Sequence, residues 1–275
     1  MPVDAETRLE PKTTLQDMEV HSVWVRQFRS GENAPFYKLA FDHIASVLGP
    51  QDDQPVVDAG CGSGTKSFEL ARRGYRVRAM DFSAVILEQA RAAAAKQGYS
   101  ERISFEQSDL TALSIPSGSV QRAVCWGVLM HVPDIGAAVA ELARVIAPGG
   151  TLVVSEGNMR SLQAVALRWL KTLLGRERAE IMRTPAGIEF WEETSTARLM
   201  TRQADIPWLI AEFRRHGLEL VERRAGQFTE IYVLLPWKPL RLMVHAINNH
   251  WFRWIKHAGP AYGNLLMLRR PTSDS

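Results

Sequence analysis

The chain has 275 residues, 46% of them hydrophobic and 23% charged, which is enough for a packed core in one large domain. The formal net charge of +3 is too small to indicate a nucleic-acid-binding protein. With only two cysteines we expect no disulfide framework and a reducing, cytoplasmic location. The polar start lacks the layout of a signal peptide, and no window reaches the roughly 18 consecutive apolar residues of a membrane span.

Residues 1–54 are expected to form a polar tail and a helical cap. From about residue 15 to residue 48, apolar side chains recur at helical spacing, and Gly49-Pro50 ends the pattern.

From residue 55 to residue 156, short apolar segments alternate with helix-length segments. We expect strands at 55–58, 77–80, 103–106, 122–126 and 151–155 and helices at 66–73, 83–97 and 135–146. Ser83 is a suitable N-cap and Gly98 a suitable C-cap for the second of these helices. The alternation predicts βαβ units and a parallel sheet.

The rhythm changes after Glu156. Residues 157–205 are rich in Arg, Leu, Trp and Met and have no clear strand, so we interpret them as a mostly helical insertion that forms a lid. Residues 206–275 return to the core with a helix at 206–216 and strands at 218–223 and 265–269, and they enclose an inserted segment at about 236–262. The fold class expected is α/β, with a doubly wound, mostly parallel seven-stranded sheet and helices on both faces.

A glycine-rich turn follows the first expected strand and carries Gly60, Gly62 and Gly64. Glycine lets the backbone turn sharply and approach a ligand, and the start of the next helix offers N–H groups without partners. The spacing of the third glycine does not fit a dinucleotide motif, and Lys66 after Thr65 does not fit a P-loop. A third possibility is a site for S-adenosylmethionine.

Five segments in chain order resemble the motifs of the Rossmann-like (class I) S-adenosylmethionine-dependent methyltransferases, with the closest similarity to small-molecule, ubiquinone-type members. These segments are Asp58–Gly64, Asp81–Ser83, Ser108–Leu110, Cys125–Asp134 and Ala147–Leu152. The resemblance implies a Rossmann-like fold, with S-adenosyl-L-methionine as cofactor and S-adenosyl-L-homocysteine as product.

The resemblance also implies a set of cofactor-binding residues: Asp58, Gly60, Cys61, Gly62, Asp81, Phe82, Asp109, Leu110 and Trp126. In it, Asp81 accepts hydrogen bonds from the ribose hydroxyls, Asp109 accepts one from the adenine amino group, and Phe82 covers the adenine ring. Asp58 holds the ammonium group directly or through water. The structural alternatives are that Asp58 only fixes the turn, Asp81 caps a helix, Phe82 fills the core and Asp109 caps a turn.

Two residues are candidates for catalysis. His131 has the ordinary pKa of a base near neutral pH, but related enzymes with different substrates often carry His here, which favours a role in organising the loop. Glu156, together with Asn158, is expected to face the pocket and orient the substrate. The Glu192-Glu193 pair is a weaker candidate, and no metal site is predicted.

An aromatic roof is expected above the cofactor. We assign to it Trp24, Phe28, Phe36 and Tyr37 before the core, and Leu167, Trp169, Leu170, Leu173, Leu174, Phe190 and Trp191 after it. Such a roof favours methylation of an O or N atom of a hydrophobic small molecule such as a phenol, polyketide, quinone or lipid.

Two other functions stay open. One is an RNA or protein methyltransferase, although we see no basic platform and expect no nucleic acid as partner. The other is a non-catalytic S-adenosylmethionine-binding regulatory protein. Basic and aromatic residues at 168–176 and 237–256 also permit peripheral membrane contact, a partner helix or an ordinary lid.

Overall fold

The computed structural model describes residues 31–174, 180–193 and 198–272. Its central sheet has seven strands in the order β3-β2-β1-β4-β5-β10-β9. Their bounds are β1 Val56–Ala59, β2 Val77–Asp81, β3 Ile103–Gln107, β4 Val120–Trp126, β5 Ile146–Gly157, β9 Glu219–Ala225 and β10 Gly263–Arg269. Strands β1 to β5 run parallel, whereas β10 is antiparallel to both β5 and β9. The prediction of a mostly parallel seven-stranded sheet is confirmed.

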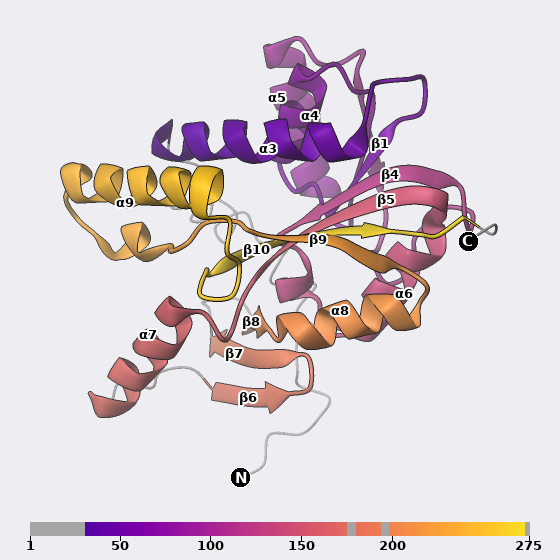
Figure 1. The fold of residues 1–275 in the computed structure, drawn as a ribbon. Helices are drawn as coiled ribbons and strands as arrows, with labels where there is room; N and C mark the ends of the chain where they lie inside the picture. Colours follow the sequence, from indigo (N-terminus) through magenta and orange to yellow (C-terminus); the bar gives the residue numbers. More distant parts are fainter. Residues whose placement is uncertain (1–30, 175–179, 194–197, 273–275) are drawn as a thin grey trace.

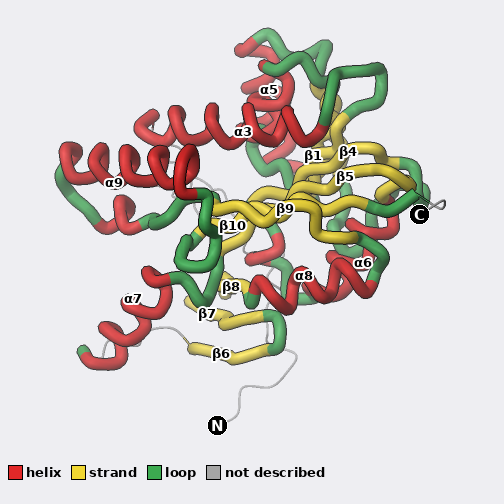
Figure 2. Tube along the Cα trace, in the orientation of Figure 1, coloured by secondary structure: helices red, strands yellow, loops and turns green. Residues whose placement is uncertain are grey.

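Helices cover both faces of this sheet, as Figures 1 and 2 show. One face carries α3 Ala34–Leu48, α4 Thr65–Arg72 and α5 Ala84–Gln97, and the other carries α6 Ile135–Val145 and α8 Ile206–Arg215. Neighbouring residues of β1 point to opposite faces. Val56 therefore joins the core beneath α3 and α4, while Val57 joins the core beneath α6 and α8. Burial on both faces explains why the strands of the centre are nearly continuous apolar runs.

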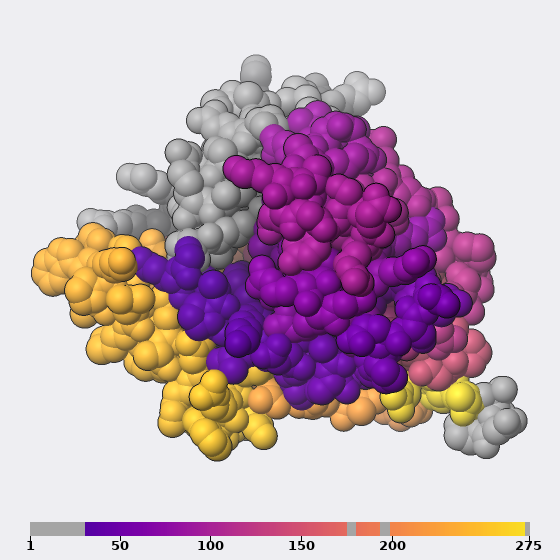
Figure 3. Space-filling view, turned by 90° about the horizontal axis from the view of Figure 1, so that it is seen from above, coloured from indigo at the N-terminus to yellow at the C-terminus, as the bar shows by residue number. Residues whose placement is uncertain are grey.

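Both predicted caps of α5 are confirmed. The Ser83 side chain accepts a hydrogen bond from the Ile86 N–H, and Gly98 adopts the left-handed conformation at the C-terminus. The N-terminal cap is described from the short helix η2 Gly31–Asn33 onward, so Trp24, Phe28 and the earlier part of the expected helix lie outside the described residues. Figure 3 shows α3 (indigo) lying between α9 (gold) and the magenta α4–α5 region.

The insertion after β5 differs from the sequence prediction. It contains one helix, α7 Leu162–Leu173, followed by an antiparallel sheet of β6 Glu180–Thr184, β7 Gly187–Glu193 and β8 Arg198–Ala204. The prediction of a mostly helical insertion over 157–205 was therefore wrong for the second half of this segment, which forms strands. Arg and Glu have good helix propensity, so the sequence of this segment favours a helix. In the sheet, Glu189 and Arg202 lie opposite each other on neighbouring strands, and this pairing of opposite charges favours the strands instead.

The segment between β9 and β10 holds η4 Ile231–Leu234, α9 Lys238–His250 and the single π-helical turn η5 Trp251–Ile255. Helix α9 packs beside α3, on the same side of the sheet. Within the described ranges, no helix combines the length and apolar character that crossing a membrane requires.

Candidate functional site

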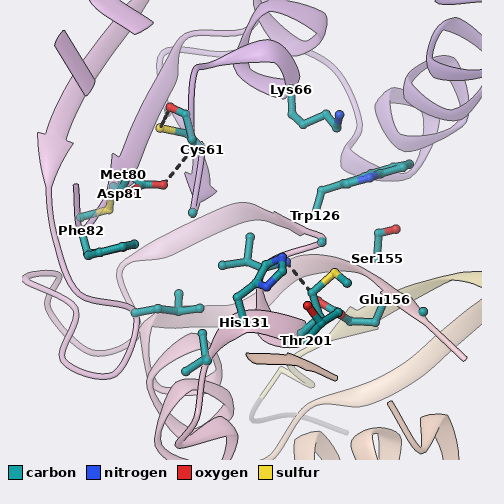
Figure 4. Close-up of a pocket in the computed structure, with 18 of the residues that line it drawn as sticks. Cys61, Lys66, Met80, Asp81, Phe82, Trp126, His131, Ser155, Glu156 and Thr201 are labelled. Atoms are coloured by element: carbon teal, nitrogen blue, oxygen red, sulfur yellow. Dashed lines mark hydrogen bonds between the residues drawn. The ribbon is translucent and has the colours of Figure 1, made fainter. Parts of the chain in front are cut away.

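A pocket of about 670 Å³ lies at the carboxyl ends of the parallel strands, within the roughly 300–1,000 Å³ typical of small-molecule sites. Ligands of doubly wound sheets bind at this edge, where the strand order reverses between β1 and β4. Figure 4 shows Met80, Asp81 and Phe82 on one side of the pocket, and Ser155, Glu156 and Thr201 on the opposite side. After the roles expected of Asp81 and Glu156, we name the first side the adenosine end and the second the acceptor end.

The glycine-rich turn after β1 forms part of the floor. The N–H groups of Gly60 and Cys61 both donate to the Met80 carbonyl at 2.8 Å. Gly60 has a φ of +79°, and a Cβ there would lie only 2.5 Å from the Val128 side chain. The absence of a side chain at this residue lets the turn close against the segment after β4. Gly60, Cys61 and Gly62 all line the pocket.

Asp81 ends β2 and lines the pocket. Its Oδ2 accepts a hydrogen bond from the Gly62 N–H at 2.9 Å, and its Oδ1 accepts one from the Ser83 N–H at 3.0 Å. An ionised carboxylate has about four acceptor positions, so these two backbone bonds do not by themselves use the capacity of the side chain. Asp81 thus fixes the glycine turn while its carboxylate stays at the pocket wall.

Phe82, Asp109 and Leu110 line the same end of the pocket. The Phe82 ring is partly exposed and is therefore not core filler. Asp109 Oδ1 accepts hydrogen bonds from the N–H and the hydroxyl of Thr111, so this residue does cap a turn, as the structural alternative states. Asp109 therefore caps a turn and also lines the pocket, so one role does not exclude the other.

Asp58 does not line the pocket: its side chain is buried beneath the floor, where Ser67 Oγ donates a hydrogen bond to Oδ2. Burial raises the pKa of Asp58 to about 6, opposed by Ser67 and by the nearby charge of Lys66. Lys66 itself lines the pocket, and its Nζ lies 3.8 Å from the centre of the Tyr37 ring. Lys66 was not predicted to be a site residue, because its position after Thr65 argues only against a P-loop.

Trp126 lines the pocket at the end of β4. Its ring stacks on Phe41 at 5.4 Å and meets Tyr37 edge to face at 5.9 Å between centroids. Helix α3 thereby holds the indole in place. Tyr37 lines the pocket as predicted, whereas Phe36 is buried in the core.

His131 lies in the short helix η3 Leu129–His131, and its ring lines the pocket. Nδ1 lies 3.1 Å from the carbonyl oxygen of Met200 on β8. A carbonyl oxygen only accepts, so Nδ1 carries the proton in this bond. This hydrogen bond joins the loop after β4 to strand β8 of the insertion. Such a link is what we expect if His131 organises the loop.

Glu156 occupies the end of β5 and lines the pocket, but almost all of its surface is buried. Its Oε1 accepts hydrogen bonds from the N–H groups of Leu129 at 2.9 Å and Val128 at 3.2 Å, while Oε2 makes none with a described residue. Burial raises the pKa of Glu156 to about 8, against the lowering effect of those donors and of Arg202. Near neutral pH the carboxyl is thus largely protonated.

Asn158 does not face the pocket, contrary to the prediction. Its Nδ2 donates to the carbonyl oxygens of Gly259 at 2.9 Å and Ala261 at 3.3 Å, because the chain leaves the sheet after Gly157. Glu192 is exposed on β7 and does not line the pocket. The side chain of Glu193 lies outside the described residues.

The predicted apolar roof from the insertion is also wrong. None of its residues lines the pocket: Leu167, Trp169, Leu170, Leu173, Leu174, Phe190 and Trp191. Helix α7 projects away from the central sheet (Figure 1), and β8 contributes Thr201 to the pocket instead. Glu230 and Tyr262 complete the acceptor end. They lie outside any motif, so no local pattern marks them.

A seven-stranded sheet of this strand order, with a glycine turn after β1 and a carboxylate at the end of β2, defines a Rossmann-like fold with a nucleoside-type pocket. Residues 56–150 match the model of the methyltransferase domain family. A ubiquinone biosynthesis O-methyltransferase of Cupriavidus pinatubonensis is 33% identical over 197 residues, which cover 70% of this chain and 71% of that protein. Another from Erwinia tasmaniensis is 27% identical over 80% of this chain and 86% of that protein.

The fold is also similar to solved structures. Magnesium protoporphyrin IX methyltransferase from Synechocystis PCC 6803, with bound S-adenosylhomocysteine, has a TM-score of 0.60 at 18% identity, covering 94% of this chain and 99% of that one. The chain belongs to the class I S-adenosylmethionine-dependent methyltransferases, and its cofactor is S-adenosylmethionine.

Proposed function

We propose that the protein transfers a methyl group from S-adenosylmethionine to an oxygen or nitrogen atom of a hydrophobic small molecule. The observation that carries the proposal is one continuous pocket with two chemically different ends, in which Asp81, Phe82 and Asp109 line the adenosine end. Relatives named as O-methyltransferases of ubiquinone biosynthesis support the same chemistry. The cofactor supplies an electrophilic methyl group, and the protein supplies position and electrostatics.

The residues of the adenosine end match the groups of the cofactor. Asp81 would accept hydrogen bonds from the ribose hydroxyls, and Phe82, Asp109 and Leu110 would enclose the adenine. Gly60, Cys61, Gly62 and Trp126 line the pocket where the methionine part would lie.

Two side chains of opposite charge, Asp58 and Lys66, lie beside the place proposed for the methionine part of the cofactor. Asp58 beneath the floor and Lys66 at the wall are close enough for the charge of Lys66 to lower the pKa of Asp58. They complement the ammonium and carboxylate of an amino acid, with Asp58 acting through an intervening water because its side chain does not line the pocket.

At the acceptor end, His131 would position the loop after β4 through its bond to Met200, and Glu156 would orient the acceptor group with its Oε2. A carboxyl that is largely protonated can donate a hydrogen bond to the substrate.

Calorimetric titration with S-adenosylhomocysteine tests the cofactor site. Replacing Asp81 with Ala is expected to weaken binding by about 1–3 kcal/mol, the cost of leaving hydrogen-bond partners unpaired. Asp42→Ala, at an exposed aspartate of α3, is the matched control and should leave the affinity unchanged. An equal affinity of the Asp81 variant and the wild type would remove Asp81 from the site. Cofactor binding without turnover on phenols, amines, acids or lipids would favour the regulatory protein instead.

We also infer that this is a cytoplasmic enzyme that contacts a membrane surface peripherally. Helix α7 and the segment from η4 to η5 expose large apolar side chains, among them Trp169, Trp237 and Trp254, each 67–69% exposed. Neither 157–176 nor 231–273 contains an Asp or Glu, whereas both contain Arg and Lys. Gln163 of α7 accepts hydrogen bonds from Thr229 and Glu230, so the two segments lie side by side. The apolar and basic residues of these two neighbouring segments complement an anionic lipid surface.

Co-sedimentation with vesicles tests this contact. Binding to vesicles with phosphatidylserine should exceed binding to pure phosphatidylcholine and should fall when Trp169 and Trp237 are both replaced by Ser. The variant Val221→Ser, at an exposed apolar residue of β9, should bind like the wild type. Equal recovery with and without vesicles would reject the membrane contact and leave a partner helix or a lid.

A further inference from the structure

The acceptor end contains a carboxyl group that the proposed function does not yet use, that of Glu230. This residue precedes η4 and lines the pocket together with Glu156 and Tyr262. The antiparallel pairing of β10 with β5 places Gly263 opposite Gly157 and Asn264 opposite Glu156. A Cβ on Gly157 would lie 3.3 Å from the Tyr262 hydroxyl oxygen, so the phenol packs directly against the end of β5.

Tyr262 lies near both carboxyl groups. Burial raises the pKa of its phenol above the ordinary value, and the negative charges of Glu230 and then Glu156 raise it further. Three titratable oxygen groups from three separate segments thus converge at one end of the pocket. Lys66 and His131 are the basic side chains among the described residues that line it, and the first packs on Tyr37 while the second donates to Met200.

The backbone of Glu230 is held, but its carboxyl group is not. Its N–H donates to Gln163 Oε1 at 2.6 Å. No hydrogen bond or ion pair joins the carboxyl to another described residue, and desolvation raises its pKa to about 7 with no cation close enough to oppose the shift. Glu230 is partly exposed and lines the pocket, so a donor from outside the chain can reach its carboxyl group.

We propose that Glu230 accepts a hydrogen bond from a hydroxyl or ammonium group of the methyl acceptor and takes up the proton that this group releases. The inference rests on the proposed methyl transfer. In that step, the O–H or N–H proton passes to the Glu230 carboxylate, and an ammonium group gains its lone pair only by this transfer. The lone pair on the acceptor oxygen or nitrogen forms the new bond to the methyl carbon, and the carbon–sulfur bond breaks with its electron pair on sulfur, which becomes a neutral thioether.

The assignment narrows the class of acceptor. A carboxylate or phosphate at this end would bring no proton to the Glu230 carboxylate, and the two like charges would repel each other in a desolvated site. A neutral phenol or alcohol, or an ammonium group, instead supplies the donor that Glu230 lacks. The acceptor therefore presents a proton donor, and not an anion, to the reacting end of the pocket.

Three probes with the same tail test this assignment: 4-hexylcatechol, 4-hexylbenzylamine and 4-hexylbenzoate. Each is titrated calorimetrically into the protein loaded with S-adenosylhomocysteine. The catechol and the amine should bind at least about tenfold more tightly than the benzoate, which corresponds to 1.4 kcal/mol. Glu230→Gln should weaken binding of the two donor probes about tenfold and leave the affinity for S-adenosylhomocysteine within about twofold. Glu219→Gln, at an exposed glutamate of β9, is the control and should change neither.

Three results would overturn the assignment: a benzoate that binds as tightly as the catechol, no binding of either donor probe, or unchanged donor binding in Glu230→Gln. If that variant does not fold, the ranking of the three probes on the wild-type protein decides. Failure of S-adenosylhomocysteine to bind the wild type is a different result, and it would reject the proposed function itself.

Discussion

Arg202 Nη2 lies 2.7 Å from Glu189 Oε1, and both side chains are almost completely buried between the insertion and the pocket rim. The same guanidinium donates to the carbonyl oxygens of Leu129, Val132 and Pro133 in the segment after β4. One side chain thus attaches β8 to the loop that carries His131.

Replacing Arg202 with Ala is expected to lower the free energy of unfolding by about 3–5 kcal/mol, because it leaves the Glu189 carboxylate buried without its partner. Urea denaturation measures the change. Arg160, whose side chain is 61% exposed in its ion pair with Asp205, provides the comparison, and Arg160→Ala should cost no more than about 1 kcal/mol. Equal costs for the two variants would contradict a buried attachment.

Gly60→Ala should abolish cofactor binding or weaken it severely. An L-residue in the left-handed conformation costs roughly 1–2 kcal/mol, and here the added Cβ would also meet Val128 at 2.5 Å. Gly118 has a φ of +63° with open space around it, so Gly118→Ala isolates the cost of conformation alone. Thermal unfolding and titration with S-adenosylhomocysteine compare the two variants, and similar behaviour would show that the contact with Val128 is unimportant.

Stability should fall as pH rises, in part because of Glu156. Its folded-state pKa of about 8 lies above the ordinary 4.5, so the folded protein binds more protons than the unfolded chain between these values. The unfolding free energy therefore decreases from pH 4.5 towards pH 8. Glu156→Gln keeps an acceptor for the two N–H groups but cannot ionise, and its loss of stability from pH 5.5 to 8.5 should be smaller than that of the wild type. Urea denaturation at both values decides, and an unchanged slope would exclude Glu156 as a cause.

Replacing His131 with Ala should change the affinity for S-adenosylhomocysteine by no more than a few-fold, because the ring acts on the loop through Met200. His131→Asn places an amide donor on a shorter side chain and should recover most of the turnover that the Ala variant loses. Single-turnover rates with any accepted substrate provide the measurement. A loss of about a hundredfold in the Asn variant, with binding intact, would instead indicate general base catalysis.

The pocket lining at the adenosine end could be predicted because its determinants are local. Asp81 is the last residue of its strand, Gly60 and Asp109 follow theirs within two residues, and the parallel sheet brings those strand ends together. Burial on both faces marks the strands, and the caps Ser83 and Gly98 mark a helix. None of these signals depends on contacts between distant parts of the chain.

The acceptor end could not be predicted, because distant segments build it. Thr201 arrives through the pairing of β7 with β8, and Tyr262 through the antiparallel return of β10 beside β5. Asn158 was predicted to face the pocket because it closely follows Glu156 in the chain. The chain turns after β5, however, and the Asn158 amide donates hydrogen bonds to the segment before β10 instead. Strand pairing at this range has no local sequence signal.

The two ends of the pocket separate two proposed tasks of the enzyme, which are binding of the methyl donor and binding of the methyl acceptor. Residues at the ends of β1, β2 and β3 line the part of the pocket proposed for the cofactor, which is the same in every reaction, whereas Thr201, Glu230 and Tyr262 come from the insertion and from the connections around β10. Substitutions or length changes in those peripheral segments can therefore redirect the enzyme towards a new acceptor while the donor remains held as before.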